Sequence, residues 1–186
     1  LTDGTEIVGE TNIDIREVKP DIPISKVYLD PQAKIFPQAK EAILQADLVV
    51  LGPGDLYTSI IPNLLVIGVA ESIAKSGARV AFVINLMTKQ GETDHFTASR
   101  FIEEIRRYLM QAAGKLSYVV LNKEFKDGQT LAWYKKFGSE QVKDDINGTE
   151  IQVIRGNFAE NGTKAAHFIR HDPQKLARAL VKILKE

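Results

Sequence analysis

Residues 49–63 read VVLGPGDLYTSIIPN, which combines a buried strand, a glycine-rich turn and the start of a helix. This order places backbone N–H groups at a helix N-terminus, where the helix dipole favours anions. Gly52 and Gly54 let a phosphate approach the backbone closely. The hydroxyls of Thr58 and Ser59 can donate hydrogen bonds to its oxygens. The stretch therefore predicts an α/β fold with a phosphate-binding turn, and a tight turn without a ligand is the alternative.

Composition narrows the class of protein. The 186 residues suffice for one domain with a full core, and we expect a single α/β domain over residues 1–186. The 24 basic side chains balance 24 acidic ones, so no global charge favours nucleic acid or an anionic membrane. Cysteine is absent, which excludes disulfides and suits a cytoplasmic protein. No apolar run reaches the ~20 residues of a membrane-spanning helix, so we expect no membrane insertion.

The pattern of apolar and turn residues predicts alternating strands and helices. Expected strands cover residues 26–29, 48–51, 79–86, 118–121 and 151–154, and expected helices cover 37–46, 63–75, 97–113 and the stretch after 172. Residues 2–13 are predicted to form a β-hairpin, and residues 124–148 to be irregular. Alternation of this kind favours a mostly parallel sheet with helices on both faces, a three-layer α/β/α arrangement. Ligands then bind beyond the carboxyl ends of the strands.

A second loop leaves the strand that ends near Leu86. Asn85 and Thr88 stand at its start as candidate ligand-binding residues. Glu92 and Asp94 can offer oxygen ligands to a divalent cation, and His95 can act as an acid or base. The alternative is a solvated loop in which Asp94 caps the following helix.

Two further regions contain candidate ligand-binding groups. Trp133 and Tyr134 can stack on a base, or they can fix a long loop to the body of the protein. Arg170 can bind phosphate in a bidentate way, or it can pair with Asp172 at the start of the last helix. Residues 124–148 can alternatively form a surface for a protein partner, and the sequence leaves a homo-oligomer open.

Several motifs together resemble those of the YvcK group within the CofD-like superfamily, over nearly the whole chain. They are LGPGDLYTSIIPNLLV at 51–66, NLMT at 85–88 with GETD at 91–94, DGT at 3–5 with GETNI at 9–13, and RHDP at 170–173. This group usually has Gln-Pro where this chain has Lys89-Gln90. Its N-terminal part carries a Gly-Gly-Gly-Thr-Gly loop that this sequence lacks, so we expect the chain to be the C-terminal part of a longer CofD-like protein.

The resemblance implies a Rossmann-like fold and a cytoplasmic bacterial protein that binds a UDP-sugar, UDP-N-acetylglucosamine in particular. It implies the role of a gluconeogenesis factor, linked to growth on gluconeogenic carbon sources, peptidoglycan synthesis and cell shape. It also implies that Tyr134 and Arg170 take part in nucleotide-sugar binding. A regulatory binding protein without an established reaction or cofactor is thus the leading hypothesis.

The alternative that the resemblance offers is an enzyme. The 2-phospho-L-lactate transferases of this superfamily move a phospho-lactyl group onto a deazaflavin alcohol with the help of Mg²⁺. Glu92 and Asp94 would then support the magnesium ion.

Overall fold

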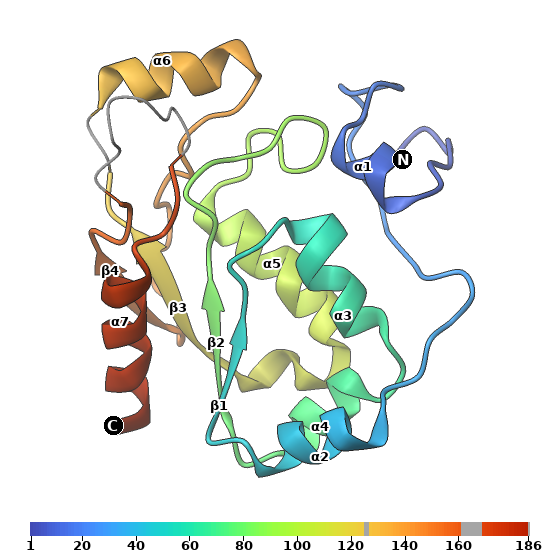
Figure 1. Ribbon diagram of the computed structural model, residues 1–186, viewed down its shortest axis with the longest axis vertical. Helices are drawn as coiled ribbons and strands as arrows, with labels where there is room; N and C mark the ends of the chain where they lie inside the picture. Colours follow the sequence, from blue (N-terminus) through green and yellow to red (C-terminus); the bar gives the residue numbers. More distant parts are fainter. Residues whose placement is uncertain (125–126, 161–168, 186) are drawn as a thin grey trace.

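The computed structural model describes residues 1–124, 127–160 and 169–185. Its centre is a parallel sheet of four strands in the order β1 (Leu48–Leu51), β2 (Arg79–Val83), β3 (Leu116–Asn122) and β4 (Gln152–Gly156). In register, Val49 lies opposite Val80, Phe82 opposite Val119, and Val120 opposite Ile154. Figure 1 shows the strands side by side with their carboxyl ends towards the same edge. The predicted parallel α/β fold is confirmed.

The strand order equals the chain order, and right-handed crossovers between such strands lie on one face of the sheet. That face packs against α5 (Ala98–Leu109), whose Phe101 and Ile105 are completely buried beside Phe82. The opposite face packs against α7 (Pro173–Lys185) through Leu176. Alternate residues of a strand point to opposite faces, which explains why Phe82 belongs to one core and its neighbour Val83 to the other.

Two predicted β-elements at the start of the chain are wrong. Residues 2–13 form no hairpin, and the segment folds instead into the short helix α1 (Glu10–Asp14) after Gly9, whose φ is +95°. Residues 26–29 form no strand either, and the N–H of Val27 donates to the hydroxyl of Tyr108 at 2.9 Å. A side chain of α5 thus satisfies a backbone group that the prediction had assigned to a neighbouring strand.

The helices agree with the predictions in part. Helix α2 (Pro37–Gln45) is confirmed. The predicted helix at 63–75 is divided into α3 (Ile61–Leu65) and α4 (Val69–Lys75), because Gly68 between them has a φ of +100°. A π-helical turn over Leu56–Ile60 precedes α3.

The segment 124–148 contains a helix that the prediction missed. Helix α6 (Gly128–Lys136) follows Asp127, whose carboxylate accepts hydrogen bonds from the N–H groups of Gln129 and Thr130. Asp127 is the N-cap residue that marks this helix start in the sequence. Figure 1 shows α6 beyond the carboxyl edge of the sheet, above α7.

Candidate functional site

An ammonium group and three carboxylates meet beyond the carboxyl ends of β1 and β2. The Nζ atom of Lys89 donates to Asp14 of α1 and to Asp55, with 2.7 Å between Nζ and the Asp55 oxygen. It also lies 3.1 Å from an oxygen of Glu92. The four groups come from three segments that are far apart in the sequence. Lys89 therefore joins α1, the loop after β1 and the loop after β2.

Glu92 occupies the place where the sequence predicted a bound anion. Its carboxylate accepts a hydrogen bond from the N–H of Tyr57 at 3.2 Å and one from the hydroxyl of Thr58 at 3.4 Å. These donors lie at the start of the helical turn that follows Gly54, where the helix dipole favours negative charge. The side chain of Glu92 is completely buried, and burial raises its pKa. An anion of the chain itself thus binds at this end of the predicted phosphate turn.

Lys89 and the carboxylates around it shift one another's pKa values. Burial by itself would lower the pKa of Lys89, but the hydrogen bonds to Asp14 and Asp55 and the charge of Glu92 outweigh it and raise the pKa. The hydrogen bond from Lys89 in turn lowers the pKa of Asp14. At neutral pH the ammonium therefore neutralises part of a strongly negative group.

Oxygen atoms of Asp14, Asp55 and Glu92 lie within 4.8 Å of one another, and such a set suits a divalent cation. Asp94, the predicted companion of Glu92, accepts a hydrogen bond from the N–H of Gly91 at 2.7 Å and so closes the loop locally. Asp55 is not among the predicted site residues, although it lies within residues 49–63. Asp14 directly follows the segment 2–13 that was predicted as a hairpin, and no motif in the sequence marks it as a ligand.

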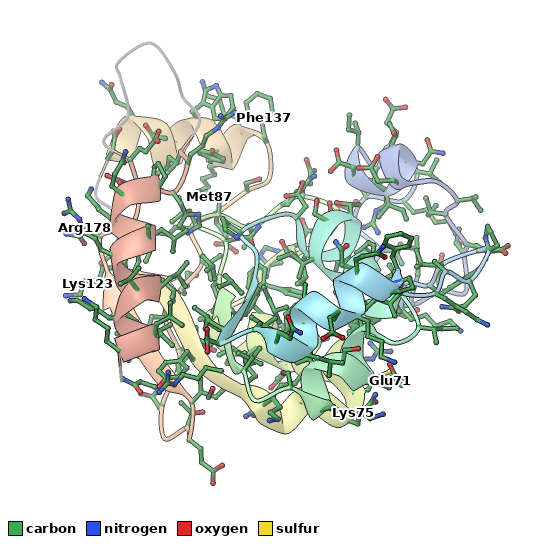
Figure 2. The ribbon with its side chains drawn as sticks, turned by 60° about the horizontal axis from the view of Figure 1, so that its bottom comes forward. Glu71, Lys75, Met87, Lys123, Phe137 and Arg178 are labelled. Carbon is green, nitrogen blue, oxygen red and sulfur yellow. The ribbon has the colours of Figure 1, made fainter. Side chains whose placement is uncertain are left out.

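Thr88 connects the second loop to the segment after α6. Its N–H donates to the carbonyl of Glu140 at 2.7 Å, and its hydroxyl accepts from the N–H of Glu140 at 2.9 Å. Met87 pairs with Gln141 in an antiparallel bridge, and Figure 2 shows Met87 beneath the region of α6. The polar groups of Thr88 are thus engaged within the protein. His95 is exposed and lies on the second loop. Its Nδ1 atom is 2.9 Å from a carboxylate oxygen of Glu140.

The Oδ1 atom of Asn85, at the carboxyl end of β2, is buried and accepts no hydrogen bond from the described residues. Most buried acceptors in folded proteins have a partner. Asn85 therefore keeps its predicted role as a candidate ligand-binding residue.

Tyr134 and Arg170 are brought to the same part of the molecule. The hydroxyl of Tyr134 on α6 accepts a hydrogen bond from the N–H of Ile169 at 3.0 Å, and Ile169 precedes Arg170. Arg170 is exposed, and its carbonyl accepts from the N–H of Glu160. Asp172 pairs with Lys175 at 3.3 Å.

The aromatic rings of α6 pack on one another. Trp133 packs on Tyr134 edge to face and on Phe137, with ring centroids 5.1 and 4.6 Å apart. These ring contacts lie within α6 and its C-cap, and Phe137 is 54% exposed.

A groove of about 340 Å³ begins at the predicted phosphate turn. Gly52, Gly54, Ser59 and Asn63 line its polar end. Gly52 has a φ of +81°, and a Cβ atom there would lie 3.1 Å from the carbonyl oxygen of Val83. Glycine is required at this position because other residues rarely adopt this conformation and the space is filled.

His171 supplies a pH-dependent contribution to stability. Burial lowers its pKa below 6.5, and contact with the backbone of Ile84 opposes this shift in part. As the pH falls, the imidazole of His171 therefore binds a proton at a higher pH in the unfolded chain than in the folded protein. The contribution of His171 is complete above pH 6.5 and is lost as the pH falls through the lower folded-state pKa.

We expect His171→Gln to remove this component of the pH dependence. Urea unfolding between pH 8 and pH 5 should give a stability difference between wild type and variant that changes below pH 6.5. A difference that stays constant over this range would contradict the buried neutral imidazole.

Within the described part of the chain, every helix is too short or too polar to cross a bilayer.

Known proteins match this chain over most of its length. A relative from Thermotoga maritima is 38% identical over 184 residues, which are 97% of this chain and 56% of the relative. The Bacillus subtilis relative, named gluconeogenesis factor, is 33% identical over 100% of this chain and 57% of the relative. The crystal structure of a Bacillus halodurans protein of the UPF0052 family superposes with a TM-score of 0.85 at 33% identity, covering 96% of this chain and 56% of that one.

This chain thus spans about half the length of the curated relatives it matches. The profile of the family described as 2-phospho-L-lactate transferase CofD matches residues 1–159, which include the carboxylate cluster and both loops around it. The chain belongs to the CofD family.

Proposed function

We propose that this chain is the nucleotide-sugar-binding part of a cytoplasmic regulatory protein whose ligand is a UDP-sugar, UDP-N-acetylglucosamine in particular. The whole protein would act as a gluconeogenesis factor, linked to growth on gluconeogenic carbon sources, peptidoglycan synthesis and cell shape. Residues 1–186 would form one domain, the C-terminal part of a longer protein. The name of the Bacillus subtilis relative supports the general role.

The observation that carries the proposal is a continuous series of contacts among the loops at one edge of the sheet. Glu92 connects the second loop to the first through Tyr57. Thr88 connects the second loop to the segment after α6. Tyr134 connects α6 to the backbone beside Arg170. Loops that share contacts in this way can hold several groups of one extended ligand in a fixed arrangement.

The contacts suggest how such a ligand would lie. Because Glu92 already binds at Tyr57 and Thr58, the diphosphate would lie on the other side of the turn, over Gly52, Gly54 and Ser59. Exposed Arg170 would pair with a phosphate oxygen, and the ring of Tyr134 would contact the base or sugar. The Oδ1 of Asn85, which has no partner among the described residues, would accept a hydrogen bond from the ligand.

Isothermal titration calorimetry of the full-length protein with UDP-N-acetylglucosamine tests the proposal. We expect saturable binding that Arg170→Ala weakens at least ~10-fold, because a charge-assisted hydrogen bond contributes about 1.5–3 kcal/mol. Arg178→Ala is the matched control, since Figure 2 shows Arg178 on the outer side of α7. No heat and no thermal shift at millimolar ligand would refute the proposal.

The family match supports a second candidate, a phospho-lactyl transferase. Asp14, Asp55 and Glu92 would then hold Mg²⁺, which stabilises charge on a transferring phosphate. The discriminating experiment is an assay for phospho-lactyl transfer to the deazaflavin alcohol. If the protein shows magnesium-dependent turnover and Glu92→Gln abolishes it, the transferase function is favoured over nucleotide-sugar binding.

A further inference from the structure

The ammonium group of Lys89 lies among three carboxylates, which belong to Asp14, Asp55 and Glu92. Within the described residues, this is the one group of acidic side chains whose oxygens could together hold a metal ion. Nζ is 2.7 Å from an oxygen of Asp55 and 3.1 Å from one of Glu92. A lysine ammonium has three N–H donors and no acceptor, so it matches three carboxylates in number. A positive charge of the chain itself thus lies where these acidic groups meet.

A divalent metal ion at this cluster would need the same space. Magnesium and calcium bind carboxylate oxygens at about 2.0–2.6 Å and lie between the oxygens that they join. The oxygens of the three carboxylates are within 4.8 Å of one another, so an ion bound to all of them would lie in the region that Nζ occupies. The ion and the ammonium would also repel each other as like charges. The cluster therefore does not fit a metal ion while Lys89 is in place.

Backbone contacts hold Lys89 beside the cluster without help from the carboxylates. Its N–H donates to the hydroxyl of Thr93 at 2.9 Å, and its carbonyl accepts from the N–H of Thr93, also at 2.9 Å. The ammonium is thus attached to a closed turn of the chain and reaches the carboxylates at high effective concentration. A metal ion has to come from solution and has no such advantage.

The exposure of the carboxylates shows what removal of the ammonium would leave. The side chain of Glu92 is completely buried, whereas those of Asp14 and Asp55 are 28% and 39% exposed. A buried carboxylate without a cation is strongly destabilising. The exposed side of the cluster gives an ion from solution access to Glu92, and carboxylate oxygens are the ligands that hard divalent cations prefer.

We propose that Lys89 is a built-in cation that takes the place of a divalent metal ion in this cluster. The wild-type protein then binds no divalent cation there, and a neutral side chain at position 89 converts the cluster into a divalent-cation site. The inference does not depend on which ligand binds at the neighbouring turn. It counts against the transferase candidate, because that function would require Mg²⁺ at the same three carboxylates.

Thermal unfolding of the full-length protein with and without CaCl₂ tests the proposal. The Tm of Lys89→Met should rise by at least ~2 °C in about 10 mM CaCl₂, because the ion binds the folded cluster and not the unfolded chain. The Tm of the wild-type protein should change by less than ~1 °C under the same conditions. Lys123→Met is the matched control and should respond like the wild type, since Figure 2 shows Lys123 at the outside of the molecule. Adding Glu92→Gln to Lys89→Met should abolish the response, which assigns it to this cluster.

Two results would overturn the proposal. One is stabilisation of the wild-type protein by Ca²⁺ or Mg²⁺ that Glu92→Gln removes, because a metal ion would then bind beside the lysine. The other is the absence of any response to Ca²⁺, Mg²⁺ or Mn²⁺ in both Lys89→Met and Lys89→Gln. If both variants are unfolded without metal, refolding in about 10 mM CaCl₂ supports the proposal and failure to refold contradicts it. A failed titration with UDP-N-acetylglucosamine affects none of these results.

Discussion

Lys89→Met is expected to lower the free energy of unfolding by about 2–3 kcal/mol at neutral pH. The variant leaves three carboxylates within 4.8 Å of one another and removes the cation that neutralises them. Breaking a buried ion pair costs about 3–5 kcal/mol, and we expect less here because the Lys89 side chain is 30% exposed. Urea unfolding monitored by circular dichroism measures the change.

The matched control for this variant is Lys123→Met. Figure 2 shows Lys123 at the outside of the molecule, and its replacement should change stability by less than about 0.5 kcal/mol. Acid should reduce the effect of Lys89→Met, because protonated carboxylates no longer repel one another. Two results would contradict the role of Lys89 as the cation of the cluster. One is a loss of unfolding free energy in Lys89→Met that equals the loss in Lys123→Met. The other is a loss in Lys89→Met that grows as the pH is lowered from 7 to 4.

Gly52→Ala is expected to lower the free energy of unfolding by about 2–3 kcal/mol. A φ of +81° costs a residue with a Cβ atom about 1–2 kcal/mol. The new Cβ would also lie 3.0 Å from Ile60 Cδ1 and 3.1 Å from the carbonyl oxygen of Val83, so the turn must shift. Because the turn lines the polar end of the groove, affinity for UDP-N-acetylglucosamine should fall as well.

Gly77→Ala provides the comparison, because a Cβ atom at Gly77 would meet nothing within 4 Å. Its effect should stay within about 0.5 kcal/mol of zero. Chemical unfolding of both variants under one set of conditions separates the strain at Gly52 from the general effect of replacing glycine. Equal stabilities for the two variants would show that the turn tolerates a side chain.

The sequence predicted the sheet and its main helices correctly where the local pattern and the final packing agree. The apolar runs at 48–51 and 118–121 form strands, as continuous apolar runs of this length usually do in parallel sheets. The stripe of Phe101 and Ile105 predicted α5 because its period matches the turn of a helix. Local patterns were less informative at the beginning of the chain. There the backbone of Val27 is satisfied by Tyr108, which is distant in sequence.

The sequence also predicted one part of the candidate site, and tertiary contacts set the rest. The sequence by itself identified Gly52 and Gly54, since the conformation that a turn requires is a local property. The tertiary structure decided that Glu92 would bind at the N–H of Tyr57 and that Lys89 would join Asp14 to Asp55. Charges exert their strongest effects across short distances in buried surroundings, and these distances are set by how separate loops fold together. The sequence by itself thus determined the sheet and the turn, whereas packing among the loops decided which charges meet beside that turn.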